Sequence, residues 1–347
     1  MSARGHSGEP FSFDRISPSR VNSYLSCGHA FKRKYIDHDP PERSGSSALF
    51  GRVVHHALEK WAVGRQQNLV TLVAQAWIEQ TEGTPIRNFL GAYQSVSVEC
   101  ARAEQAARVA WEAKNPGKES KKPRATKEFK ESAAAQSLAA LLAHWVPILN
   151  EQSPWRFTDS DPLPSLYDES LALAKRYASK WGHMPASLHT EFGFDVEWQG
   201  FMLTGYIDCI DPVIAKGGVL LGYGVTDYKT YRAEPPGAKD WRQAVIYDIA
   251  FRDLCKRGVL PFDSELPVYV VFDYVRLGER RDYVITDSDR AVLLDDLTMY
   301  RNGVSNGVYL PAQKNANPDF CDYGDSCCLR TRGEGTGCRG NLYAEAA

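Results

Sequence analysis

The spacing of apolar residues along the chain changes from a helical period to a strand period near residue 186. Before that point, apolar residues recur three or four positions apart, as on the buried face of a helix. This spacing predicts helices over residues 17–27, 50–61, 68–81, 98–113, 128–149 and 165–181. Ser17 followed by Pro18 is a typical helix start, because serine caps a helix and proline suits its first turn. The first 185 residues are therefore expected to be mostly helical.

Strand patterns follow from residue 188 onward. Residues 188–198 and 201–211 flank a Gln-Gly turn and predict a β-hairpin. Further strands are expected over residues 225–230, 267–275 and 281–286, the last two forming a second hairpin. Amphipathic helices are expected over residues 241–255 and 287–302. This mixture predicts an α/β fold in which a mixed central sheet is flanked by helices.

The same boundaries divide the chain into five expected parts. Residues 1–16 are expected to be a flexible N-terminus, and residues 17–61 the first portion of the core domain. A large helical insertion is expected over residues 62–185. The main portion of the core follows over residues 186–310, and a C-terminal cysteine segment over residues 311–347.

Composition narrows the class of protein. The 347 residues are 43% hydrophobic and 24% charged, which is typical of a folded protein. A net charge of -2 means that any nucleic acid must bind in a local groove. No apolar run reaches the ~20 residues that span a bilayer, and the N-terminus lacks the apolar core of a signal peptide. We therefore expect a cytoplasmic protein without a membrane partner, in which eight cysteines do not form a disulfide framework.

Two predicted strands carry the residues that suggest chemistry. Asp208 ends a Gly-Tyr-Ile-Asp sequence, and Asp227 precedes Lys229 by two positions, so Asp227 and Lys229 share a strand face. Two carboxylates on neighbouring strands can hold a divalent cation, and a lysine can orient water or stabilise negative charge. The alternative is an ordinary pair of solvated charges, which is the usual state of such residues. The motif therefore depends on its neighbours in the fold.

Four other residues are candidates for the same site. Glu191 is expected on the strand next to Asp208, and Gln243 and Tyr247 lie four positions apart on one helix face. His55 and His56 both lie in the predicted helix over residues 50–61, and only one of them can face the interior. Ordinary packing of Tyr247, a solvated Gln243 and a structural histidine are the alternatives.

Four of the eight cysteines lie in the last 27 residues, where little else would hold the chain in a fold. They are Cys321, Cys327, Cys328 and Cys338. With Cys27, if the termini meet, they supply four thiolates for either a [4Fe-4S] cluster or a structural Zn2+. Cys327 and Cys328 are adjacent and point differently, so we expect one of them to be a ligand. A disulfide or unpaired thiols are the alternative. The remaining cysteines, in apolar surroundings, are expected to be buried thiols: Cys100, Cys209 and Cys255.

In their shared order, these motifs resemble the PD-(D/E)XK nuclease superfamily in its RecB-like branch. That branch includes the nuclease domains of RecB and AddB and the iron-sulfur CRISPR-associated exonucleases, with relatives in phages. The resemblance covers about residues 17–338, although residues 62–185 contribute no motif. The matching elements are Cys27, Gly51 to His55, Glu191, Gly205 to Asp208, Asp227 to Lys229, Gln243 to Tyr247 and the terminal cysteines.

The resemblance implies a restriction-endonuclease-like fold and a DNA nuclease, most simply an exonuclease on single strands or duplex ends. It implies that Mg2+ or Mn2+ is bound by His55, Asp208 and Asp227 with support from Glu191. It further implies that Lys229 is the catalytic cation and that Gln243 and Tyr247 contact DNA or complete the active centre.

For the cysteines, the resemblance implies an iron-sulfur cluster rather than zinc. Two of the family's terminal ligands are usually separated by two residues, whereas Gly324 stands at that offset from Cys321 here. The motif therefore does not select between Cys327 and Cys328. The alternative function is a non-catalytic DNA-end-binding or adaptor protein of a recombination or CRISPR-type complex, with a zinc-stabilised tail.

Overall fold

The computed structural model describes residues 15–311 and Tyr323, except residues 40, 42, 117–123, 125 and 234–238. The chain divides into two compact units. Residues 1–42, 54–72 and 173–347 form the first, and residues 43–53 and 73–172 form the second. Each unit is described separately below. In the described part of the chain, no helix is both long enough and apolar enough to cross a membrane.

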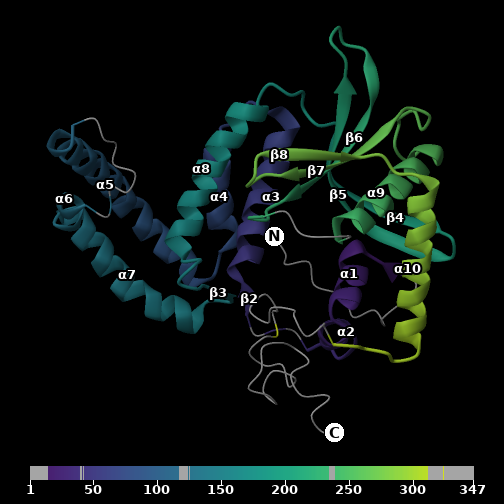
Figure 1. The fold of residues 1–347 in the computed structure, drawn as a ribbon, viewed down its shortest axis with the longest axis horizontal. Coiled ribbons are helices and arrows are strands. Elements are labelled where there is room, and N and C mark those ends of the chain that lie inside the picture. The colour runs from purple at the N-terminus through teal and green to yellow at the C-terminus, as the bar shows by residue number, and fades with distance from the viewer. Residues whose placement is uncertain are drawn as a thin grey trace. The chain divides into compact units, whose positions relative to one another are not determined.

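A mixed sheet is the centre of the first unit (Figure 1). The chain order of its strands is β1 (Arg15–Ile16), β4 (His189–Trp198), β5 (Phe201–Ile214), β6 (Leu220–Lys229), β7 (Val268–Tyr274) and β8 (Glu279–Tyr283). The spatial order is β1-β5-β6-β7-β8, with β4 antiparallel to β5. β6 and β7 are parallel, whereas β5 with β6 and β7 with β8 are antiparallel. The predicted mixed sheet and both predicted hairpins are thus confirmed.

The helix between β6 and β7 makes the crossover that two parallel strands require. This helix is α9 (Lys239–Lys256), and its apolar residues pack against the sheet in one core with residues of α10 (Asp287–Ser305). Val245 and Ile246 of α9 are fully buried there with Val225 of β6 and Val270 of β7. α10 starts at a capping box, in which the side chain of Thr286 accepts from the backbone of Asp289. α9 therefore holds one helix face directly against the strands that carry Asp208 and Asp227.

The N-terminal elements of the first unit pack beside α9 and α10. They are α1 (Pro18–Ser26), α2 (Gly28–Phe31) and the π-helix η1 (Lys32–Ile36). Ser17 caps α1, as predicted, by accepting from the backbone N–H of Arg20. Three further helices have residues in both units: α3 (Ser46–Gly64), α4 (Leu69–Gln80) and α8 (Leu163–Trp181).

The second unit is mainly helical, and two of its helix boundaries differ from the predicted ones. Its further elements are α5 (Pro85–Lys114), α6 (Lys127–Lys130), α7 (Ala133–Gln152) and two short parallel strands, β2 (Ser44–Gly45) and β3 (Trp155–Arg156). α5 starts well before residue 98, because Pro85 begins it and buried residues continue its apolar face. The helix predicted over residues 128–149 is two helices, because Ser132 caps a new one. β1, β2 and β3 were not predicted, since two-residue strands have no period.

Candidate active site

Asp208 and Asp227 lie opposite each other on β5 and β6. Cys209 pairs with Thr226 in this antiparallel pair of strands, so the next residues, Asp208 and Asp227, face each other across it. Both carboxylates are buried, and Asp208 Oδ2 accepts from the backbone N–H of Tyr228 at 2.8 Å. Three residues before Asp208, position 205 of β5 is a glycine because the ring of Phe194 packs against the backbone there. A Cβ atom at this position would lie 2.8 Å from that ring.

His55, and not His56, reaches these carboxylates. Its Nδ1 atom lies 3.2 Å from Asp208 Oδ2, and its ring meets the edge of Tyr228. His56 Nδ1 instead lies 3.7 Å from Glu59 on its own helix, α3. Burial lowers the pKa of His55, but the Asp208 carboxylate outweighs burial and raises the pKa to about 9. The imidazole is therefore held as a cation next to Asp208.

Lys229, Gln243 and Tyr247 surround Asp227. Lys229 Nζ lies 2.7 Å from Asp227 Oδ2 and donates to Gln243 Oε1 at 2.6 Å. Gln243 Nε2 donates to Asp227 Oδ1 at 2.6 Å and to the Tyr247 hydroxyl at 2.7 Å. The Tyr247 hydroxyl donates to the carbonyl of Tyr206 at 2.6 Å. The strand and the face of α9 thus form one hydrogen-bonded network around a single carboxylate.

The charges of this network oppose the effect of burial. Burial raises the pKa of Asp227, and the Lys229 ammonium acts in the opposite direction. Burial lowers the pKa of Lys229, yet the Asp227 carboxylate raises it above its ordinary value. Burial also raises the pKa of Asp208, but the His55 cation outweighs this and holds the pKa below its usual range. Each buried carboxylate is therefore matched by a cation, the buried Lys229 for Asp227 and the half-buried His55 for Asp208, as the cost of burying charge requires.

Asp240 is a member of this cluster that the sequence reasoning missed. Its Oδ1 lies 3.8 Å from Lys229 Nζ, and its Oδ2 accepts from the Tyr274 hydroxyl at 3.0 Å. The ring of Phe272 lies under the same ammonium, 4.9 Å from its centroid. The signal was present in the sequence, because Asp240, Gln243 and Tyr247 follow each other at helical spacing. It was missed because the helix was expected to start at residue 241.

Glu191 lies on β4 opposite the position of Asp208, as predicted. Thr190 pairs with Cys209 and Phe192 pairs with Ile207, while Glu191 itself has a φ of 48°. A left-handed backbone is unfavourable for a residue with a Cβ atom, and such residues are often found at functional sites. The structure therefore brings the backbone of Glu191 to the site, where β4 continues but its regular pairing with β5 skips this residue.

The helix ends around Cys27 meet the chain that leads to the C-terminal segment. Cys27 lies between α1 and α2, where its Sγ accepts from the backbone N–H of Ala30 at 3.4 Å. The next residue, Gly28, donates its N–H to the Leu310 carbonyl at 2.7 Å. A Cβ atom at Gly28 would lie 2.7 Å from Leu310 N, so this close approach needs glycine. The four terminal cysteines, Cys321, Cys327, Cys328 and Cys338, lie outside the described residues.

The other three cysteines are buried, as predicted: Cys100, Cys209 and Cys255. Burial raises the pKa of all three thiols, which keeps them protonated.

The donor set around Asp208 and Asp227 suits a hard divalent cation. Carboxylate oxygens and one imidazole nitrogen are ligands that Mn2+ and Mg2+ accept. Among the described residues, no three His, Cys, Asp or Glu side chains are arranged closely enough to form a metal site by themselves. In this arrangement the cations that neutralise the carboxylates are His55 and Lys229. The donor atoms of these residues are thus of the types that bind such a metal, although their present spacing does not form a metal site.

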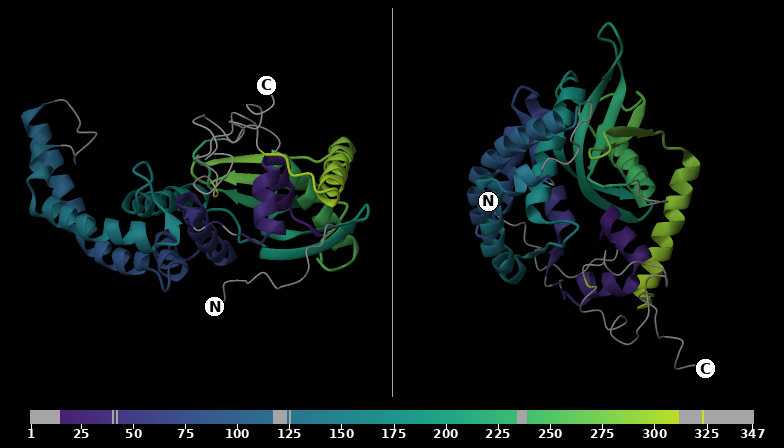
Figure 2. Two further views of the ribbon diagram at one scale, coloured as in Figure 1. Left: turned by 90° about the horizontal axis from the view of Figure 1, so that it is seen from below. Right: turned by 60° about the vertical axis from the view of Figure 1, so that its left-hand side comes forward.

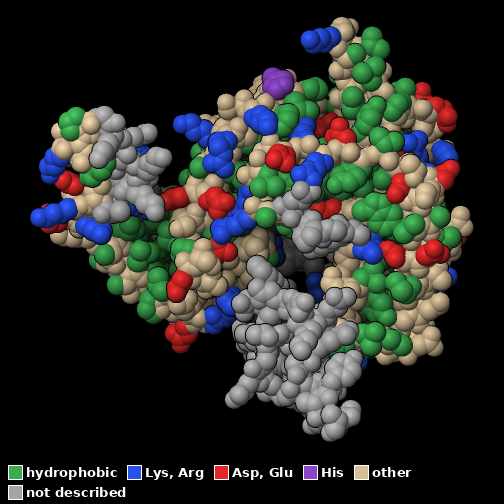
Figure 3. Space-filling model, in the orientation of Figure 1, with side chains coloured by type: hydrophobic (Ala, Val, Ile, Leu, Met, Phe, Trp, Pro, Cys, Tyr) green, Lys and Arg blue, Asp and Glu red, His purple; other side chains and the backbone are tan. Residues whose placement is uncertain are grey.

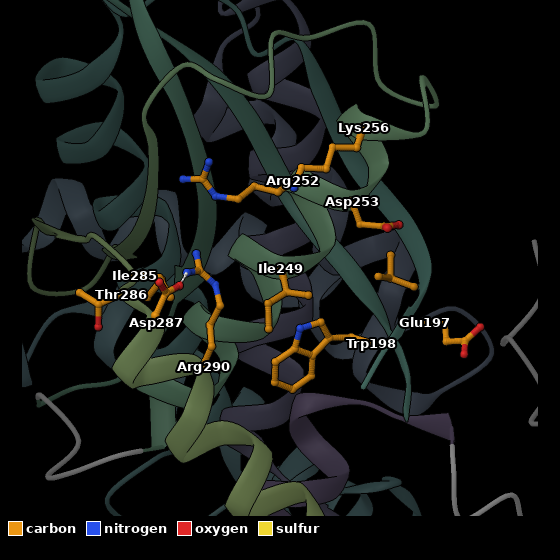
Figure 4. Close-up of a pocket in the computed structure, with 11 residues that line it drawn as sticks. Glu197, Trp198, Ile249, Arg252, Asp253, Lys256, Ile285, Thr286, Asp287 and Arg290 are labelled. Carbon is orange, nitrogen blue, oxygen red and sulfur yellow. Dashed lines mark hydrogen bonds and ion pairs between the residues drawn. The ribbon is translucent and has the colours of Figure 1, made fainter. Parts of the chain in front are cut away.

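A separate pocket on the other side of α9 contains none of the predicted site residues. Its volume is about 660 Å³, and it lies among β4, α9 and the start of α10 (Figure 4). Its arginines are paired already. Arg252 Nε lies 2.9 Å from Asp248, and Arg290 lies 2.5 Å from Asp248 and 2.7 Å from Asp287. The site defined by Asp208, Asp227 and Lys229 is therefore distinct from this pocket.

The mixed central sheet flanked by helices is the architecture of a restriction-endonuclease-like fold. The model of the PD-(D/E)XK nuclease superfamily matches residues 15–328. The chain belongs to the PD-(D/E)XK nuclease superfamily.

Among solved structures, the chain is similar to a crystal structure of a "putative exonuclease" from Eubacterium rectale. The two share 9% sequence identity with a TM-score of 0.39, over 91% of this chain and 90% of that chain. A search of curated proteins gives no match.

Proposed function

We propose that this nuclease hydrolyses DNA as a metal-dependent exonuclease acting on single strands or duplex ends. The observation that carries the proposal is the buried ion pair of Asp227 with Lys229, beside Asp208 and His55. A pure DNA-binding protein has no need to bury two carboxylates and a lysine together, because burial of charge is costly. A nuclease does need fixed charges in its active site, because they stabilise the charge that develops on the phosphodiester during cleavage.

The residues of the site take separate roles in this proposal. His55, Asp208 and Asp227 would hold Mg2+ or Mn2+, with Glu191 supporting the site. When bound, such a metal supplies a hydroxide nucleophile and shields the charge of the phosphodiester. Lys229 would orient the attacking water or stabilise the negative charge that develops. Gln243 and Tyr247 keep Asp227 in position, because Gln243 Nε2 and the Tyr247 hydroxyl both donate to Asp227 Oδ1, at 2.6 Å and 3.1 Å.

Cleavage of labelled DNA with and without added metal tests the proposal directly. We expect the purified protein to degrade single-stranded DNA with Mn2+ or Mg2+ and to stop when EDTA removes the metal, because the carboxylates then lose their bound cation. Gel analysis of end-labelled strands measures the rate and the product lengths. Binding of DNA ends without cleavage at any metal concentration would contradict the proposal and favour an adaptor of a recombination or CRISPR-type complex.

We further propose that the protein belongs to the RecB-like branch and that Cys27 and the C-terminal cysteines bind a [4Fe-4S] cluster. The hydrogen bond of Gly28 with Leu310 supports this, because it brings the start of the C-terminal segment next to Cys27. Cys321, Cys338 and one of Cys327 and Cys328 would complete four thiolates, a set that also suits Zn2+.

Replacement of Cys27 by alanine is expected to release the metal of this second site. Iron and zinc analysis and visible absorbance of anaerobically purified protein measure the loss, and limited proteolysis measures the loosened C-terminal segment. Brown protein with broad absorbance indicates iron-sulfur, and colourless protein with zinc rejects it. Cys255→Ala is the matched control, because Cys255 is a buried thiol on α9. Unchanged metal content and proteolysis in Cys27→Ala would remove Cys27 from the ligands.

A further inference from the structure

β5 and β6 continue beyond the rest of the sheet as a two-stranded ribbon, residues 212–222. The pairing of β4 with β5 ends at Ile210, and the pairing of β7 with β6 begins at Tyr223. Between these points β5 and β6 pair only with each other, with a register shift next to Ile214. Figures 1 and 2 show this β5–β6 ribbon projecting past the neighbouring strands.

The surface of the β5–β6 ribbon is apolar and carries no acidic residue. Ile214, Val219, Leu220 and Leu221 are 47%, 63%, 37% and 48% exposed. Lys216, at the turn, is its one charged residue, in a chain with 43 acidic residues (Figure 3). Three successive residues of an extended chain cannot all point to one side, so aliphatic side chains are presented on both sides of the ribbon. Proteins seldom expose such a cluster without a binding role.

The ribbon and the candidate active site are parts of the same two strands. Asp208 precedes Ile214 by six residues on β5, and Asp227 follows Leu221 by six residues on β6. At a strand rise of about 3.3 Å per residue, the exposed aliphatic residues begin ~20 Å from the carboxylates. At the duplex rise of about 3.4 Å per nucleotide, roughly six nucleotides cover that distance, and this is an upper limit because a separated strand is more extended.

We propose that the β5–β6 ribbon is a wedge that separates the last base pairs of a DNA duplex, so that one strand reaches Asp208 and Asp227. This inference rests on the proposed nuclease function. Aliphatic side chains can insert between bases and unstack them. Lys216 would contact a phosphate, and the absence of carboxylates avoids repulsion of the DNA backbone by a protein of net charge -2. Apolar groups on both sides suit an element that lies between two separated strands.

The triple variant Val219→Ser, Leu220→Ser, Leu221→Ser tests the wedge on three substrates. They are single-stranded DNA, a blunt duplex, and a duplex whose end carries six unpaired nucleotides on each strand. We expect cleavage of the blunt duplex to slow by about 10-fold or more, because inserted aliphatic side chains offset an unstacking cost of a few kcal/mol per base step. Single strands and the frayed duplex should be cleaved at the parent rate, since their ends need no separation. The matched control is Val292→Ser with Met299→Ser, two exposed apolar residues of α10.

A second measurement is independent of cleavage. Duplex DNA with 2-aminopurine in its terminal base pair becomes more fluorescent when that pair opens. The parent protein in EDTA should raise this fluorescence, and the triple variant should lose at least about half of the increase, because it lacks the inserted aliphatic groups. A blunt duplex cleaved at the parent rate, an equal loss on single strands, or unchanged 2-aminopurine fluorescence would each overturn the wedge. Failure of the parent to cleave any DNA overturns the proposed function instead, and the fluorescence result then decides the wedge.

Discussion

Asp208→Asn is expected to slow cleavage of DNA by at least about 100-fold, whereas Asp211→Asn on the same strand should leave it nearly intact. Both aspartates are buried in β5, at 9% and 5% exposure. Asp208 faces His55 and the backbone N–H of Tyr228. Asp211 instead accepts from the hydroxyls of Ser187 and Thr226, at 2.5 Å and 2.9 Å. The two aspartates therefore lie on the same strand and are similarly buried, and they differ in the groups that their carboxylates contact.

The two variants separate stability from catalysis. Each removes a charged acceptor from a buried network and should cost about 1–3 kcal/mol in the free energy of unfolding. Only Asp208→Asn removes a proposed metal ligand, for which we expect a loss of at least about 100-fold in rate, since even outer partners of metal ligands cost 10–100-fold. Thermal unfolding and single-turnover cleavage at several Mn2+ concentrations measure the two effects. Equal cleavage rates in the two variants would contradict the assignment of Asp208.

Lys229→Met should slow cleavage by about 100-fold or more even at saturating Mn2+. A methionine keeps most of the aliphatic volume above Phe272, but it removes the ammonium that lies 2.7 Å from Asp227 Oδ2. The expected size follows from the loss of a group that stabilises charge in the transition state. Because Asp227 keeps its hydrogen bonds with Gln243 and Tyr247, the carboxylate should stay in position.

The dependence on metal distinguishes the role of Lys229 from that of the ligands. Lys229→Met should lower the maximal rate without a higher metal requirement, whereas Asp208→Asn should need more metal. Lys256→Met is the control, because it makes the same substitution at a lysine that ends α9 and lines the separate pocket, away from Asp227. We expect that control to cleave at the parent rate. A maximal rate within a few-fold of the parent in Lys229→Met would exclude Lys229 from the chemistry.

The motifs that the sequence revealed are those whose parts lie close together along the chain. Asp227 and Lys229 are two residues apart on β6, so the period of a strand alone puts them on one face. Gln243 and Tyr247 are four residues apart on α9, and the 2.7 Å hydrogen bond between their side chains follows from helical spacing. The hairpin of β4 and β5 was likewise predicted from the turn at residues 199–200.

The spacing of neighbouring residues did not predict the contacts of a side chain where its partner lies far away in the chain. Nothing in the helix over residues 50–61 distinguishes His55 from His56, and the choice follows from how α3 meets β5 at Asp208. Asp240 joined the site only because β6 ends beside the first turn of α9. The single helix predicted over residues 128–149 was wrong for a local reason, since Ser132 caps a helix in the middle of that range.

The α/β class, the helices before residue 186 and the short motifs could be predicted from the chain alone, because apolar period, turn residues and side-chain spacing are properties of neighbouring residues. Packing between distant segments sets which buried carboxylate of β5 contacts a histidine and which contacts two hydroxyls. The same packing makes β5 and β6 extend beyond the neighbouring strands, so that aliphatic residues are exposed there. Strand register and the ends of pairing depend on contacts between distant segments, and the pattern of one segment does not contain them.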